Sequence, residues 1–248
     1  MSNIQLRPAY WASVSGGKDS LYMLKLILSN LHEYPLDGVV YFDLETDFPF
    51  IKDVISYMES ECKKYNITFL RIKPRRTWAE LYEKYGYPRR SARWCNGAYK
   101  LDCKRQLDKM ELGRGRYTVY YIGFCADETK RFVQGQLDKG IVRYPLVDKG
   151  IVESEILHWA AQLPIYNDYY KYNKRCGCIM CPMASRINVA YTKLYYPAEY
   201  EKYMAYIKES EKRFGYKYLG RYDSDYLDHI TDVKWLPRLK AMINNDKY

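Results

Sequence analysis

The residues best suited to bind phosphate form one run of six, Ser15-Gly16-Gly17-Lys18-Asp19-Ser20. The two glycines let backbone N–H groups turn toward an anion, and a helix that starts here would add the positive end of its dipole. Lys18 contributes a positive charge, and the serines contribute hydroxyl donors. Asp19 would repel phosphate, and a Mg²⁺ ion bridging its carboxylate to a pyrophosphate resolves that conflict. The run predicts a phosphate site, with an ordinary glycine-rich turn as the alternative.

Three of the seven cysteines fall within six residues, at Cys176, Cys178 and Cys181. In a chain without a secretory signal, such clustering favours a metal or redox site over a disulfide framework. Cys178-x-x-Cys181 has the spacing of half a zinc or iron–sulfur site, and Cys95 is the candidate for a fourth ligand. Cys176 and Cys178 are close for two corners of one site, so Cys103 or Cys125 could replace Cys176. Iron–sulfur, zinc and unliganded thiols all stay open on spacing alone.

Two carboxylates and an arginine, Asp127, Glu128 and Arg131, follow a segment rich in β-branched and aromatic residues at 117–124. Ligands of open α/β sheets bind at the carboxyl ends of strands, and an arginine there could clamp a phosphate or sulfate bidentately. The alternative is a solvated helix start, where acidic residues are favourable.

Basic residues accumulate at 71–76 (RIKPRR) and 89–93 (RRSAR), and Trp78 and Trp94 lie beside these runs in the sequence. Such a stretch suits a single-stranded nucleic acid, which places phosphates on guanidinium groups and bases on rings. A solvated loop around the nucleotide pocket explains it equally well.

Hydrophobic periodicity predicts strands that alternate with helices. Strands are expected at residues 10–14, 38–42, 67–72 and 117–124, and helices after residue 20 and at 50–65, 95–110, 151–163 and 199–214. This order indicates an α/β fold with a doubly wound, mainly parallel, Rossmann-like sheet and a helical, cysteine-containing C-terminal extension. We expect a nucleotide-binding domain at 1–150 and the extension at 151–248.

The composition is that of a folded, basic protein, with 48% hydrophobic and 28% charged residues and a formal net charge of +10. The positive excess suits a polyanionic ligand, although a merely basic protein would share it. The N-terminus lacks the layout of a signal peptide, and the apolar stretch at 21–28 is too short to cross a bilayer. We therefore expect a cytoplasmic protein without a membrane partner.

The six-residue run resembles the SGGxDS signature of PP-loop ATP pyrophosphatases and of the PAPS reductases related to them. It is not a Walker A loop, which needs four residues between its first Gly and the Gly-Lys-Ser/Thr. Other segments resemble the PAPS-reductase-like branch in the right order, namely residues 43–49 (DLETDFP), Arg93-Trp94-Cys95 with Lys100, and residues 123–131 (GFCADETKR), 144–146 (YPL) and 177–182 (GCIMCP). Leu44 and Glu45 depart from the Thr-Gly expected after Asp43, and Phe124-Cys125 stands where an Arg is common.

The resemblance implies a site as well as a fold. It implies ATP and Mg²⁺ as cofactors, with catalytic roles for Lys18, Asp19 and Arg131. The residues that it implies for nucleotide binding are Ser15, Gly16, Gly17, Lys18, Asp19, Ser20, Asp43, Arg93, Lys100, Asp127 and Glu128. It favours a [4Fe–4S] cluster, with zinc as the alternative, on Cys95, Cys176, Cys178 and Cys181.

Three functions fit these expectations. The first is a PP-loop ATP pyrophosphatase that adenylates a substrate, expected to be DNA or RNA, for sulfur transfer, as enzymes of DNA phosphorothioation and tRNA thiolation do. It would work with a sulfur donor protein, as a homo-oligomer or a complex subunit. The second is a PAPS or APS reductase, whose nucleophilic cysteine lies near the C-terminus; no cysteine follows Cys181 here, so the first is preferred. The third is a non-catalytic nucleotide-binding subunit of a modification or defence complex.

Overall fold

The computed structural model describes residues 6–131 and 139–246, which form two compact units that interleave along the sequence. Unit 1 comprises Met1–Asp43, Pro49–Arg75 and Lys100–Tyr170, and unit 2 comprises Leu44–Phe48, Arg76–Tyr99 and Lys171–Tyr248. The two-domain division near residue 150 stays a prediction.

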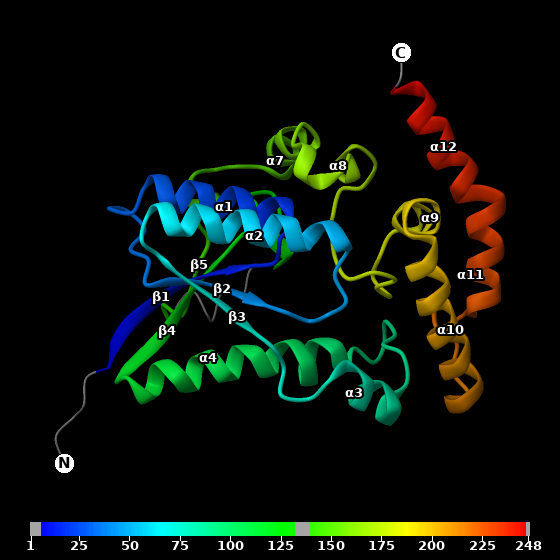
Figure 1. The fold of residues 1–248 in the computed structure, drawn as a ribbon, viewed down its shortest axis with the longest axis horizontal. Helices are drawn as coiled ribbons and strands as arrows, with labels where there is room; N and C mark the ends of the chain where they lie inside the picture. Colours follow the sequence, from blue (N-terminus) through cyan, green and yellow to red (C-terminus); the bar gives the residue numbers. More distant parts are fainter. Residues whose placement is uncertain (1–5, 132–138, 247–248) are drawn as a thin grey trace. The chain divides into compact units, whose positions relative to one another are not determined.

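A five-stranded parallel sheet forms the centre of unit 1 (Figure 1). Its strands are β1 (Arg7–Val14), β2 (Gly38–Phe42), β3 (Thr68–Ile72), β4 (Arg116–Ile122) and β5 (Val142–Arg143). They lie in the order β3-β2-β1-β4-β5, and every neighbouring pair is parallel. The expected doubly wound α/β fold is confirmed. The chain winds to one side of β1 and then to the other, which places the topological switch point between β1 and β4.

Helices cover both faces of this sheet. The helical segments of unit 1 are α1 (Lys18–Ser29), α2 (Pro49–Lys64), α4 (Leu101–Gly113), η2 (Thr129–Arg131), α6 (Pro145–Asp148), α7 (Glu153–Ala161) and η3 (Pro164–Tyr166), with α8 (Tyr169–Tyr172) at its end. Figure 1 shows α1 and α2 on one face and α4 on the other. Because both faces are covered, all five residues of β2 are buried, which explains the unbroken apolar run Gly-Val-Val-Tyr-Phe.

Unit 2 is helical. Its segments are α3 (Trp78–Tyr85), the π-helical turn η1 (Cys95–Lys100), whose last residue begins the next part of unit 1, α9 (Arg186–Tyr195), α10 (Pro197–Phe214), α11 (Ser224–Ile230), η4 (Thr231–Trp235) and α12 (Leu236–Asn245). The helical extension around the cysteines is thus confirmed. Among the described residues, no helix is long and apolar enough to cross a membrane.

Buried tyrosines hold unit 2 together. Tyr87 and Tyr218 are almost fully buried, and both hydroxyls donate to the carbonyl oxygen of Met180, at 3.1 and 2.6 Å. The hydroxyl of Tyr216 donates in turn to the carbonyl oxygen of Tyr87 at 2.8 Å. A buried tyrosine needs such a partner for its hydroxyl. These bonds fix the backbone at Met180, which lies between Cys178 and Cys181.

Candidate nucleotide-binding site

The phosphate loop, residues 15–20, joins β1 to α1 at the switch point of the sheet, where open α/β sheets bind ligands. Gly16 has φ +74°, and a Cβ there would lie 2.7 Å from Cγ2 of Ile51. Gly123, just past β4, would bring a Cβ to 2.9 Å from the carbonyl oxygen of Asp19. Close backbone packing at both glycines therefore sets the position of the loop.

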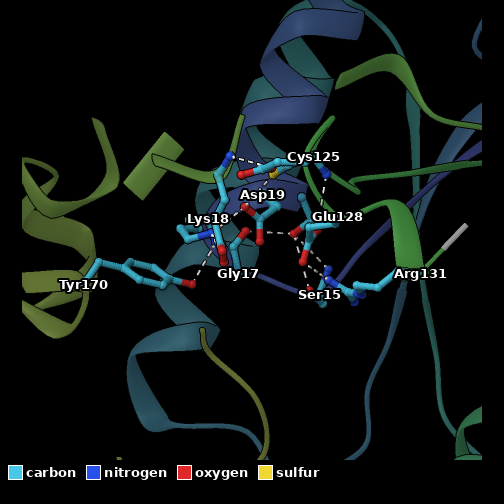
Figure 2. Close-up of polar contacts among 11 residues, drawn as sticks. Ser15, Gly17, Lys18, Asp19, Cys125, Glu128, Arg131 and Tyr170 are labelled. Carbon is cyan, nitrogen blue, oxygen red and sulfur yellow. Dashed lines mark hydrogen bonds and ion pairs between the residues drawn. The ribbon is translucent and has the colours of Figure 1, made fainter. Parts of the chain in front are cut away.

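Three hydrogen bonds of ordinary length hold the backbone at the start of α1. The hydroxyl of Ser20 donates to the carbonyl oxygen of Gly17 at 2.9 Å and accepts the N–H of Ser15 at 3.2 Å. The hydroxyl of Tyr170 accepts the N–H of Lys18 at 2.8 Å, as Figure 2 shows. The loop and the helix N-terminus together form the backbone arrangement that binds anions.

Lys18 is fully buried and lies between two carboxylates. Its Nζ is 2.5 Å from Oδ1 of Asp19 and 3.5 Å from Oε1 of Glu153. Burial raises the pKa of Asp19, the charge of Lys18 opposes that rise, and Glu128 adds to it. Lys18 thus neutralises Asp19 within the protein, which removes the conflict that the sequence posed for a carboxylate in a phosphate site.

The acidic residues that follow β4 are anchored by specific contacts. Glu128 is nearly buried; its Oε1 pairs with Arg131 Nη1 at 2.7 Å, and its Oε2 accepts the N–H of Cys125 at 3.2 Å. Asp127 accepts the first N–H of α7, that of Glu153, at 3.0 Å. The Arg131 guanidinium also lies 4.1 Å from the centre of the Phe124 ring. Asp19, Glu128 and Arg131 therefore lie in one region, as their place after β1 and β4 predicts, and Figure 2 shows them together.

Cys125 lies beside the phosphate loop. Its Sγ is 3.5 Å from Oδ1 of Asp19, and burial raises the pKa of its thiol, as does the charge of Asp19. The sequence offered Cys125 and Cys103 as spare metal ligands; both belong to unit 1, whereas the other candidate ligands belong to unit 2. The pKa of Cys103 is raised to about 11, mainly by burial.

The remaining nucleotide-binding candidates are spread over both units. Asp43 follows β2, donates its N–H to the carbonyl oxygen of Ile72 at 2.9 Å and has Lys73 Nζ 3.7 Å from its carboxylate. Lys100 lies in unit 1 and is exposed, and Arg93 lies in unit 2. Their contact with a nucleotide stays a prediction.

Sequence reasoning missed Glu153 and Tyr170, which both contact Lys18. They lie 135 and 152 residues away in the chain, and neither belongs to a recognisable motif. Glu153 is the first residue of α7, where an acidic side chain is expected for the helix itself. No sequence signal pointed to its contact with the loop.

The turn at Cys178–Cys181 is tightly held. The N–H of Cys181 donates to the carbonyl oxygen of Cys178 at 3.2 Å, and Met180 has φ +50°. The N–H of Ile179 donates to the carbonyl oxygen of Thr46 at 2.8 Å. With the two tyrosine hydroxyls on Met180, these bonds fix the backbone that carries both thiols.

Cys95, Cys178 and Cys181 lie close enough to interact electrostatically. Burial, followed by the charge of Cys181, raises the pKa of Cys95; burial raises the pKa of Cys178 to about 12, with Cys181 and Cys95 contributing. The N–H of Met183 donates to Sγ of Cys181 at 3.4 Å, a contact that stabilises a thiolate. Sγ of Cys176 lies 3.9 Å from the carbonyl oxygen of Gly177.

Thiols are the ligands that soft metals prefer, and Cys95, Cys178 and Cys181 lie within electrostatic range of one another. In the part of the chain that the structure describes, no group of three or more His, Cys, Asp or Glu side chains is arranged to hold a metal ion as it stands. The thiols would have to draw together around one.

The chain matches the profile of the phosphoadenosine phosphosulfate reductase domain over residues 9–184, which is more than half of its length. The chain belongs to this family. The resemblance read from the motifs is thereby confirmed, and membership supports a nucleotide-binding role related to sulfur transfer.

Two curated relatives come from Methanocaldococcus jannaschii. The uncharacterized protein MJ0973 is 32% identical over 82% of this chain and 48% of its own length, and the uncharacterized protein MJ0066 is 26% identical over 83% and 42%. The chain thus spans less than half the length of either relative.

Two solved structures are also similar to this chain. The phosphoadenylyl-sulfate reductase from Candida auris, a phosphate complex, has a TM-score of 0.39 and 13% identity over 62% of this chain and 72% of that one. The U34-tRNA thiolase NcsA from Methanococcus maripaludis, with its [4Fe–4S] cluster, has a TM-score of 0.43 and 14% identity over 84% and 73%.

Proposed function

We propose that the chain binds ATP at the phosphate loop and adenylates an acceptor for sulfur transfer. An acceptor oxygen attacks the α-phosphorus, and the bond to the leaving pyrophosphate breaks. A sulfur nucleophile then displaces AMP from the activated acceptor. The observation that carries the proposal is the loop itself, fixed at the switch point of the sheet by Gly16 and Gly123 in a chain of this family.

Asp19 and Glu128 are the residues that would hold Mg²⁺. Both offer carboxylate oxygens, the ligands that this ion prefers, and they lie close enough for the charge of Glu128 to raise the pKa of Asp19. Bound Mg²⁺ would offset the charge of the phosphates. Arg131, held between Glu128 and the Phe124 ring, has a side chain that is 42% exposed, and its guanidinium would bind a phosphoryl oxygen.

Cys95, Cys178 and Cys181 would hold a [4Fe–4S] cluster, with Cys176 as the proposed fourth ligand and zinc as the alternative metal. When bound, such a cluster would supply a carrier for the sulfur that is transferred. The chain's own contribution is the fixed turn at Met180 and the N–H donor on Cys181 Sγ, because hydrogen bonds to the sulfurs tune such clusters.

The thiol at the loop argues against reductase chemistry. A reductase requires a thiolate that attacks the sulfur of PAPS or APS. Cys125 is the described thiol in contact with the loop, and it is buried against Asp19 with a raised pKa. A buried, protonated thiol is a poor nucleophile.

Pyrophosphate release tests the proposal against the reductase and the non-catalytic subunit. Anaerobically purified protein is given ATP, Mg²⁺ and a mixture of transfer RNA and DNA, and separately PAPS or APS with thioredoxin. We expect pyrophosphate and AMP only when nucleic acid is present, and no sulfite. Sulfite formed without ATP would establish the reductase, and ATP binding without turnover under any condition would establish the non-catalytic subunit.

A further inference from the structure

Two arginines of unit 2, Arg90 and Arg93, lie near Cys181, and a third, Arg186, lies near Arg90. Nε of Arg90 donates to the carbonyl oxygen of Pro182, the next residue, at 3.0 Å. Arg93 and Arg90 both lie near enough to lower the pKa of Cys181 against the effect of its burial. Arg186 is half-buried, and its pKa is lowered first by burial and then by the charge of Arg90. We call these residues the arginine cluster.

The arginine cluster has no carboxylate to balance it among residues 6–131 and 139–246. Other arginines of the chain do have such partners. Arg213 pairs bidentately with Glu83, and Arg75 pairs with Asp102. The unbalanced charge is therefore a local feature and does not follow from the basic composition alone.

Backbone structure holds these cations in place. Arg89 and Ala92 exchange both backbone hydrogen bonds, at 3.3 and 3.1 Å, which closes a turn that carries Arg90. Arg186 is the first residue of α9, whose N-cap Ser185 accepts the N–H of Asn188 at 3.2 Å. Keeping like charges together costs free energy, and bound anions would recover it.

Exposed aromatic rings adjoin the cluster. Tyr226 is close enough to influence the pKa of Arg186. The rings of Tyr222 and Tyr226 stack with centroids 4.1 Å apart and planes at 17°, and each side chain is 39% exposed. The Arg221 guanidinium lies 5.6 Å from the centre of the Tyr222 ring. The arginine cluster, which lacks carboxylate partners among the described residues, lies beside an exposed pair of aromatic rings. This combination suits a nucleic acid strand that offers both phosphates and unpaired bases.

We propose that the arginine cluster binds the phosphates of a single-stranded nucleic acid segment, one of whose bases stacks on the exposed Tyr222–Tyr226 pair. Guanidinium groups bind phosphates bidentately, and an aromatic face accepts any base that is not already paired. A continuous duplex keeps its bases stacked inside and would use only the arginines. The strand would then lie next to Cys181. This inference rests on the proposed function, because it takes the strand to be the acceptor. It adds where the acceptor binds and that its bases are unpaired.

Fluorescence anisotropy without ATP tests this surface alone. The probes are labelled RNA and DNA single strands of about 12 nucleotides, within the usual site sizes, and the corresponding duplexes. We expect tighter binding of the single strands, and about tenfold weaker binding of them by Tyr222→Ala/Tyr226→Ala. Arg93→Gln should lower the slope of log affinity against log salt by about 0.7, the value for one phosphate contact on a single strand.

Arg105→Gln is the matched control, because it removes an exposed arginine from α4 of unit 1 and should leave binding unchanged. Equal affinity for duplexes and single strands, or unchanged binding by the double tyrosine variant, would overturn the proposal. Unchanged binding by the double tyrosine variant would mean that the arginines only balance the thiolates or bind small anions. Competition with inorganic phosphate would show the binding of small anions. Strand binding without pyrophosphate release contradicts the proposed function alone, and pyrophosphate release without strand binding contradicts this inference alone.

Discussion

The phosphate loop of unit 1 and the arginine cluster of unit 2 treat charge in opposite ways. In the loop, Lys18 is buried against Asp19 and Glu153, and Arg131 pairs with Glu128. In the cluster, three cations lie together without a carboxylate partner in the described parts of the chain. The loop has its charges matched before a ligand arrives, so a ligand must exchange partners there, whereas the cluster gains from any anion.

Loss of the bound metal would be the largest effect, and it tests whether the cysteines beside the arginine cluster ligate a metal. Cys178→Ser and Cys181→Ser should reduce iron, or zinc, from near stoichiometry to almost none, because each removes a proposed ligand. Elemental analysis of protein purified without oxygen measures this.

Cys62→Ala, which removes a buried thiol from α2 of unit 1, is the control and should keep the metal. Cys176→Ser should retain metal with a changed absorption spectrum, as expected for the fourth ligand. Stoichiometric metal in Cys178→Ser would show that the site does not exist as proposed.

The second-largest effect should come from removing a charge that nearby carboxylates balance. Lys18→Met leaves Asp19 and Glu153 without their cation and should cost about 2 kcal/mol in the free energy of unfolding. That is below the ~3–5 kcal/mol typical of fully buried pairs, because both carboxylate side chains are 24% exposed. Urea denaturation measures the change.

Lys63→Met is the matched control. Lys63 pairs with Glu59 at 3.6 Å on the exposed face of α2, with its side chain 75% exposed, so the cost should stay below about 1 kcal/mol. Equal losses in the two lysine variants would remove the distinction between a matched, buried charge and an ordinary surface pair.

Removal of an unmatched charge should have the smallest effect. Arg186→Gln relieves repulsion from Arg90 and should leave the free energy of unfolding within about 0.5 kcal/mol of the wild type, or raise it slightly. The same urea titration measures it. A loss as large as that of Lys18→Met would mean that Arg186 serves the fold, and the contrast between the two regions would fail.

The fold was predictable because its signals are local. The apolar run at 38–42 predicts β2 with the bounds that the structure has, and the glycine pair marks the turn into α1. The expected helix at 95–110 was right in position, but it begins as the π-helical turn η1 before α4. Short segments such as α3 and α11 gave no periodicity long enough to detect.

The site was predictable only within its motifs. The spacing identified Asp19, Glu128 and Arg131, which the structure brings together. The partners of Lys18 were not predictable, because Glu153 and Tyr170 reach it through tertiary packing across most of the chain. The proximity of Arg90 and Arg186 could not be predicted from the sequence for the same reason, since they are 96 residues apart in the chain.

Calorimetric titration of ATP with and without Mg²⁺, on the wild type and on Asp19→Asn, tests the central claim most directly. The substitution keeps the shape of the side chain and removes the charge that would hold the ion beside the phosphate loop. We predict that the wild type binds ATP more tightly with Mg²⁺, and that Asp19→Asn loses about tenfold or more of that affinity, since charged hydrogen bonds contribute ~1.5–3 kcal/mol. Equal affinity of both proteins for ATP in the presence of Mg²⁺, or no binding by the wild type, would contradict the assignment of the loop.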